Sequence, residues 1–213
     1  DFANIKHVYH KSVSNLLAVG LLLFGLIWLN IENLVAFLNW ISHKESGGYD
    51  ALVPLIFIMG LAKLIDLATG VNGQIIGTSN YWKFDFFTNL FYIVLSIPLN
   101  FYLINHYQLI GLAYSNLAAL LLYNSVRFLF LYKKFNLQPY TLKHGLFLMS
   151  SIAFMFLLYK IPSPSNFLLN IAFKSTVYGV GFYGLLTWIN PAPELKDVVQ
   201  GFLKNKLFGF LRR

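Results

Sequence analysis

The sequence predicts an all-α protein, a polytopic bundle of six transmembrane helices followed by a C-terminal amphipathic helix. Only 11% of its 213 residues are charged, where a soluble domain carries about 25%. The mean hydropathy of +0.62 leaves too little polar surface to cover a water-exposed globule. The apolar runs are long and show no strict alternation, so helices are the expected spanning form. These observations exclude a soluble enzyme, a disordered chain and an ordinary nucleic-acid-binding module.

A spanning helix needs about 20 mostly apolar residues, and six segments approach or exceed that length. The first, 13–29, is stopped by the polar run Asn30-Ile31-Glu32-Asn33, after which a short interfacial helix is expected at 34–41, capped by Asn30 or Asn33. The other five are 51–76, 84–104, 109–132, 142–159 and 166–189. We therefore expect lobe helices over 1–132, two extra helices over 133–190 and a tail over 191–213.

Tryptophan, lysine and arginine predict the orientation of these spans. Trp28, Trp40, Trp82 and Trp188 end segments, as an interfacial aromatic belt requires. Six spans place both termini on one side, and only Lys44 and Lys160 fall on the other side. The terminus side carries Lys6, Lys11, Lys83, Arg127, Lys133, Lys134, Lys143, Lys196, Lys204, Lys206, Arg212 and Arg213. This bias predicts cytoplasmic termini in the inner (plasma) membrane, and it accounts for the net charge of +8 without nucleic acid.

The tail is predicted to be an amphipathic helix on the cytoplasmic leaflet. Pro191 and Pro193 end the sixth span, and apolar residues from Leu195 to Leu211 are interleaved with basic ones. Its expected role is that of a membrane anchor; the alternative is a partner-binding helix.

The second span carries an unusual polar face. Lys63 and Asp66 lie near its middle, and a helical projection groups them with Gln74 and the glycines at 60, 70, 73 and 77, while Asn72 points away. A charge at the bilayer centre costs about 2.5–3.5 kcal/mol, so such residues face a bundle interior or a pathway. Two interpretations stay open. Lys63 and Asp66 either neutralise each other as an i,i+3 pair or line an aqueous cavity and contact a charged substrate.

Polar residues also form stripes on the third, fourth and sixth spans. The stripe on 84–104 contains Asp85, Asn89, Tyr92, Ser96 and Asn100, and the stripe on 109–132 contains Asn116, Tyr123, Asn124 and Arg127. Arg127 lies near the cytoplasmic end, where it either snorkels to lipid phosphates or contacts substrate. The span 142–159 is nearly bare and is expected to face lipid. The predicted substrate-binding residues are Lys63, Asp66, Gln74, Asn89, Tyr92, Asn100, Asn124, Arg127 and Lys174.

No motif indicates an enzyme, a cofactor or a metal site. The chain has no cysteine, and it lacks an HExxH motif, a Walker loop and a Ser-His-Asp constellation. His7 and His10 have a suitable spacing for acid–base work, but at a cationic membrane edge they are interpreted as ordinary juxtamembrane residues. Amides, hydroxyls and tyrosines dominate the stripes, which favours a large hydroxyl-rich ligand over a bare ion.

Three stretches resemble the polysaccharide and lipopolysaccharide flippases of the multidrug/oligosaccharidyl-lipid/polysaccharide exporter superfamily. They are DLATGVNGQIIGTSN at 66–80, IPLNFYLI at 97–104 and LIGLAYS at 109–115. Asn100, Gly111, Ala113 and Ser115 fit the family pattern, whereas Gln108 stands where a glycine is usual.

The resemblance implies a fold of two six-helix lobes with two extra C-terminal helices, of which this chain would supply the ninth to fourteenth. The partners it implies are a lipid-linked oligosaccharide, membrane lipids and the N-terminal lobe of the same chain. The whole protein would move an undecaprenyl-pyrophosphate-linked O-antigen or polysaccharide precursor by alternating access, with a lipid-tail groove at 142–189. A drug or cation antiporter, with Asp66 as coupling site, is the nearest alternative. A membrane-embedded acyl- or glycosyltransferase is the other, and it would depend on His7 or His10.

Overall fold

The computed structural model describes residues 2–42, 49–162 and 166–211, and all regular structure within these ranges is α-helical, which confirms the predicted fold class. The helices are α1 (Phe2–Ile41), α2 (Leu52–Ala68), α3 (Asn72–Gly77), α4 (Trp82–Tyr107), α5 (Leu109–Phe135), α6 (Leu142–Lys160), α7 (Phe167–Ile189) and α8 (Pro193–Leu211). Residues 43–48, which include Lys44, and residues 163–165 lie outside the described ranges.

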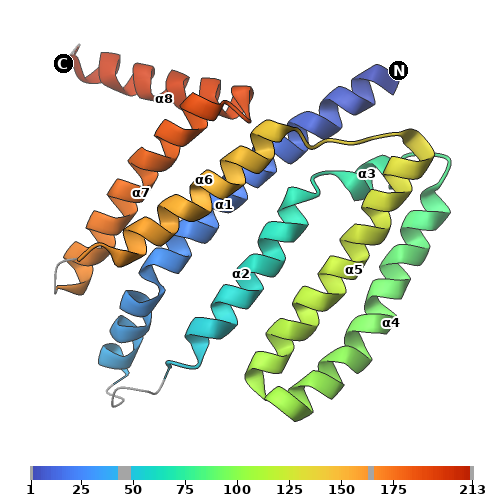
Figure 1. Cartoon of the computed structure of the whole chain (residues 1–213), viewed down its shortest axis with the longest axis horizontal. Helices are drawn as coiled ribbons and strands as arrows, with labels where there is room; N and C mark the ends of the chain where they lie inside the picture. Colours follow the sequence, from blue (N-terminus) through green and yellow to red (C-terminus); the bar gives the residue numbers. More distant parts are fainter. Residues whose placement is uncertain (1, 43–48, 163–165, 212–213) are drawn as a thin grey trace.

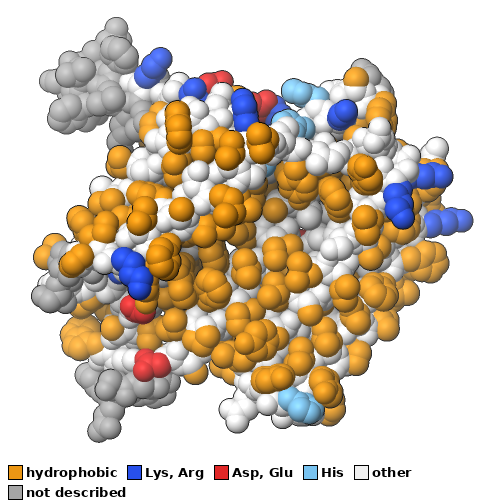
Figure 2. Space-filling model, in the orientation of Figure 1, with side chains coloured by type: hydrophobic (Ala, Val, Ile, Leu, Met, Phe, Trp, Pro, Cys, Tyr) orange, Lys and Arg blue, Asp and Glu red, His pale blue; other side chains and the backbone are white. Residues whose placement is uncertain are grey.

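The long helices lie side by side and run in alternating directions (Figure 1). α4 packs on α5, α5 on α2, and α2 on α1, while α6 and α7 pack on each other and on α1. α1 begins, and α8 lies, at the same end of the bundle (Figure 1). Hydrophobic side chains cover most of the face in Figure 2, and most of its basic side chains lie toward that end.

Among the described residues, four helices are long and apolar enough to cross a membrane: α1, α4, α5 and α6. α2 is only 17 residues long, which corresponds to about 25 Å of helix. α7 contains the polar residues Asn170 and Lys174 and is not among these four helices. A protein with several membrane-length helices is therefore established, and the count of six spans stays a prediction.

α1 differs from its prediction because it is one helix of 40 residues. The expected stop at residues 30–33 and the separate helix at 34–41 are wrong. Asn30 donates from its amide to the Leu26 carbonyl at 2.8 Å and to Ser175 Oγ of α7 at 3.1 Å. Asn33 accepts from the Asn170 amide at 3.2 Å. Since these polar side chains form hydrogen bonds with α7, they join two helices instead of capping one, and Trp28 lies within α1.

The segment 51–76 was expected to be one span, but it is divided into α2 and α3 by a turn at residues 69–71. Gly70 has φ +64°, a conformation that glycine adopts without strain. A Cβ on Gly70 would lie 2.7 Å from Val13 Cγ2 and 3.2 Å from the Val13 nitrogen. The Tyr140 hydroxyl donates to the Ala68 carbonyl at 2.9 Å, which satisfies a backbone group freed by the break.

The other four segments match the predicted ones to within a few residues. α4 continues through Pro98 without interruption. α6 faces outward with Met149, Phe156 and Leu157, but buries Phe147 and Met155 against its neighbours. One side of α6 is therefore exposed, as expected of a lipid-facing helix, and its other side packs against neighbouring helices.

α8 begins at Pro193, as predicted, and Glu194 forms an ion pair with Lys11 of α1. Val198 and Phe202 are exposed. The side chains at 203 and 205–211, which carry much of the expected apolar face, lie outside the description.

Candidate functional site

A cavity of about 470 Å³ lies between the α2–α3 turn, α4 and α5. Its polar lining comes from all of these elements, and Leu16 of α1 contributes an apolar wall. The polar lining residues are Asp66, Asn72, Gln74, Asp85, Asn89, Tyr123, Asn124 and Arg127. Because the helix breaks at Gly70, the chain turns and brings Asn72, Gly73 and Gln74 to the same cavity as Asp66.

Arg127 joins α5 to α4 at one wall of the cavity. Its guanidinium is 5% exposed and forms an ion pair with Asp85. Its Nε donates to Thr88 Oγ1 at 3.3 Å, and the guanidinium carbon lies 4.2 Å from the centre of the Tyr123 ring. The side chain is buried and bonded to α4, so the interpretation that Arg127 snorkels to lipid phosphates is wrong.

Asn124, one turn before Arg127 on α5, is the centre of a hydrogen-bond network that reaches α2, the turn after it and α3. Its Oδ1 accepts from Thr69 Oγ1 at 3.0 Å and from the Asn72 amide at 3.4 Å. Its own amide donates to Asp66 Oδ1 at 3.3 Å. The expectation that Asn72 points away is therefore wrong, because it assumed one uninterrupted helix of 3.6 residues per turn.

Asn89 and Tyr123 connect α4 to α5 a turn further along. The Tyr123 hydroxyl donates to Asn89 Oδ1 at 2.8 Å, and the Asn89 amide donates to Asp85 Oδ2 at 3.1 Å. The Tyr92 ring lies 5.1 Å from the Tyr123 ring but does not line the cavity. These hydrogen bonds link Tyr123, Asn89 and Asp85 in a chain of donors and acceptors along the cavity wall.

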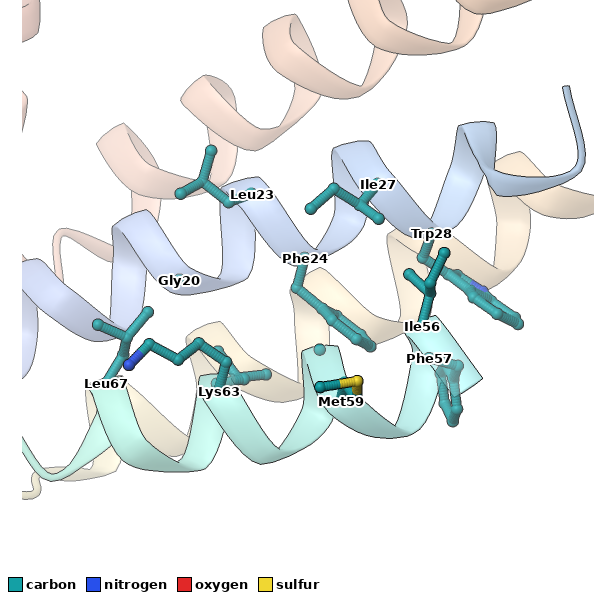
Figure 3. A pocket seen from close by; sticks show the side chains of 12 residues that line it. Gly20, Leu23, Phe24, Ile27, Trp28, Ile56, Phe57, Met59, Lys63 and Leu67 are labelled. Atoms are coloured by element: carbon teal, nitrogen blue, oxygen red, sulfur yellow. The ribbon is translucent and has the colours of Figure 1, made fainter. Parts of the chain in front are cut away.

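Lys63 and Asp66 form the expected pair, with Nζ 2.7 Å from Asp66 Oδ2. The two residues face different spaces, however. Asp66 lines the polar cavity, whereas the Lys63 side chain is 66% exposed and lines an apolar groove between α1 and α2 (Figure 3).

Five of the nine predicted residues line the cavity: Asp66, Gln74, Asn89, Asn124 and Arg127. Asn100 does not, and its Oδ1 is buried without a hydrogen-bond partner. Lys174 is buried in α7, which packs on α1 and α6 rather than on α4 or α5. A helical projection groups polar residues on one helix, but it does not tell which neighbour that face meets.

Thr69, Asn72 and Thr88 belong to the network but were not predicted. Asp85 and Tyr123 appeared on polar stripes without being chosen. Asp85, Thr88 and Asn89 are spaced i, i+3 and i+4, which is the signal that could have identified them as one face.

The site can bind a ligand through many directional hydrogen bonds. Its charges, Arg127 with Asp85 and Lys63 with Asp66, are neutralised in pairs. Within the described part of the chain, no group of three or more His, Cys, Asp or Glu side chains is placed to hold a metal ion. Amide, hydroxyl and guanidinium groups of this kind match the donors and acceptors of a polyhydroxyl ligand.

Comparison of the chain with protein-family models, curated proteins and solved structures finds no match. Over the described residues, the fold and site define an all-α protein with membrane-length helices and an open polar cavity lined by residues of α1 to α5.

Proposed function

We propose that this chain is the C-terminal part of a membrane flippase that translocates a lipid-linked oligosaccharide by alternating access. The main observation behind this proposal is the polar cavity of about 470 Å³, which lies beside the membrane-length helices α4 and α5. A passage for sugars through a bilayer needs hydrogen-bonding groups that replace water, together with an apolar exterior. The resemblance at 66–80, 97–104 and 109–115 supports the same reading.

The polar groups of the cavity would have different roles in transport. Asn89, Asn124 and Gln74 would bind sugar hydroxyls, and Tyr123 would offer a ring against a sugar face. Arg127 would hold α4 against α5, because it is bonded to both Asp85 and Thr88 of α4. The protein would act as a transporter and carry out no covalent chemistry. We place it in the inner membrane with both chain ends in the cytoplasm.

An antiporter of the same superfamily is the second candidate, since two carboxylates, Asp66 and Asp85, line the cavity. Ion coupling requires a carboxylate that changes its charge during transport. Here each carboxylate is already paired with a cation, Asp66 with Lys63 and Asp85 with Arg127. For the transferase alternative, which depends on His7 or His10, His10 Nδ1 is bonded to the Pro139 carbonyl at 2.6 Å.

The test uses the full-length protein in proteoliposomes. An undecaprenyl-pyrophosphate-linked oligosaccharide is placed in the outer leaflet, and its movement is followed by accessibility to an added glycosidase. Wild type should translocate the lipid, and Asn89→Leu should lose most of the rate because it removes a donor and an acceptor from the cavity. Asn105→Leu, at an exposed position outside the cavity, is the matched control.

Translocation of a cationic drug, driven by an ion gradient and abolished by Asp66→Asn, would favour the antiporter instead. Failure to move the oligosaccharide lipid under conditions where the protein is folded would contradict the flippase proposal.

A further inference from the structure

An apolar groove of about 340 Å³ runs between α1 and α2 (Figure 3). Phe24 and Trp28 of α1 and Phe57 of α2 contribute its aromatic lining, with ring centres of Trp28 and Phe57 4.4 Å apart. Leu23, Ile27 and Met59 line it further. A cavity with this lining suits a hydrocarbon chain.

Two glycines shape the contact between the helices. A Cβ on Gly60 would lie 2.9 Å from the Phe24 ring, and one on Gly20 would lie 3.1 Å from Leu64 Cδ1. The backbones therefore approach closely at these points. The groove therefore forms where α1 and α2 pack against each other.

One end of the groove carries a positive charge. Lys63 is the charged residue among the groove's lining residues, and its ammonium has three donors, of which Asp66 takes one. The side chain is two-thirds exposed, so the remaining donors can meet a ligand.

The groove and the polar cavity adjoin at this end. Leu67 lines both spaces, and the Lys63–Asp66 pair joins the groove to the cavity. A single amphiphile can therefore place its chain in the groove and its polar head in the cavity, with the junction between them at Lys63.

We infer that the α1–α2 groove binds the hydrocarbon chain of a lipid whose phosphate contacts Lys63. The inference rests on the proposed function and refines it, since the lipid would be the carrier of the oligosaccharide. It differs in place from the lipid-tail groove expected at 142–189, where the Phe154 ring of α6 packs against Gly181 of α7.

A second apolar groove offers an internal comparison. It has a volume of about 400 Å³, lies between α1, α2 and α6, and has no charged residue in its lining. Ile152 lines this groove and is 45% exposed, while Leu23 in the first groove is 51% exposed. The two positions are thus matched in exposure and differ in the nearby charge.

The experiment places the photoreactive residue p-benzoylphenylalanine at position 23 or 152 of the full-length protein. The protein is reconstituted in vesicles that contain undecaprenyl phosphate, phosphatidylglycerol and phosphatidylcholine, and adducts are identified by mass spectrometry. At position 23, adducts should be enriched in phosphate lipids with a net negative head, undecaprenyl phosphate above all. At position 152, adducts should follow the vesicle composition.

Lys63 variants show whether its charge is responsible. Lys63→Gln together with Asp66→Asn keeps the pair neutral and should reduce the enrichment at position 23 by about tenfold, the loss of one charge-assisted hydrogen bond. Lys63→Arg should retain it, because Arg also binds phosphate. Elution and thermal unfolding of each variant exclude misfolding as the cause.

Adducts at position 23 with peptides of the same protein would overturn the inference, because another helix would then cover the groove. So would adducts that follow vesicle composition, or enrichment of phosphatidylglycerol alone, which would indicate an annular lipid. These results do not depend on transport. Enrichment without translocation would reject the proposed function alone, and translocation without enrichment would reject the groove alone.

Discussion

Gly73 of α3 and Arg127 of α5 fit together so closely that a Cβ at position 73 would lie 2.6 Å from Arg127 Nη1. The guanidinium reaches Asp85 and Thr88 of α4 from this position. The missing side chain at Gly73 thus allows three helices to meet at one cation. A glycine that stands among polar residues in the sequence thus allows α3 to pack closely against the wall of the candidate site.

We expect Gly73→Ala to displace Arg127 and weaken the α3–α4–α5 contact. Overpacking of this kind costs about 1–3 kcal/mol. Thermal unfolding of the purified protein should shift downward, and translocation should fall. Gly184→Ala is the control, since nothing lies within 4 Å of a Cβ there. Equal unfolding temperatures for the two variants would contradict the described contact.

Arg127 and Asp85 should behave as a coupled pair. Arg127→Ala leaves Asp85 without its cation, and removing one partner of a buried pair costs about 3–5 kcal/mol. Asp85 is 23% exposed, so the lower end of that range is expected. The double variant Arg127→Met with Asp85→Leu should be more stable than either single variant. Additive losses in a double-mutant cycle would show that the two side chains do not interact.

Substitutions of Lys63 and Asp66 can distinguish a structural ion pair from a contact with the substrate. If they only neutralise each other, apolar replacement of both should be tolerated, and either single replacement should be worse. If Lys63 holds a substrate phosphate, Lys63→Ala and the double replacement should both abolish export at normal expression, and Lys63→Arg should retain part of it. We expect the second result. A fully active double variant would assign the pair a purely structural role.

Single cysteines test the predicted topology without interference, because the chain has none of its own. Cysteine at Ser42 or Asn105 should react with a membrane-impermeant maleimide in intact cells. Cysteine at Asn80 or Lys133 should react only after permeabilisation. Ser42 and Asn80 flank α2 and α3, so labelling of both from one side would show that this short segment does not cross.

The Lys11–Glu194 pair predicts a pH-dependent contact between α1 and α8. The hydrogen bond from Lys11 and its charge, together with a hydrogen bond from Asn15 and the charge of His7, hold the pKa of Glu194 below its usual value. A lowered pKa means that the contact is stabilised above the ordinary glutamate pKa of about 4.3 and is lost only as the pH falls through the lower, folded-state value.

A pair of fluorophores on cysteines at Lys6 and Val198 would measure this contact. Energy transfer should be constant above pH 4.3 and fall below it. Glu194→Gln should show the low-pH transfer at every pH. A wild-type transition centred well above the ordinary value would contradict the assignment.

The amino-acid sequence by itself determined the helical class, four membrane-length helices and most of their ends. These depend on local hydropathy and on residues such as Asn166, whose side chain accepts from Leu168 and Leu169 to cap α7. It also identified Asp66, Asn89, Asn124 and Arg127 as inward polar residues, because the exclusion of polar groups from lipid acts on each helix separately.

Only the tertiary structure decided which of these residues share a site. α1 continues through Asn30 and Asn33, which form hydrogen bonds with Ser175 and Asn170 of α7. Asn72 turns toward Asn124 because Gly70 breaks the helix against Val13. Lys63 and Asp66, adjacent on one helix face, separate into an apolar groove and a polar cavity because different helices pack on the two sides of α2. Hydrogen-bond partners and neighbouring backbones far apart along the chain decide these outcomes, and local periodicity contains no information about them.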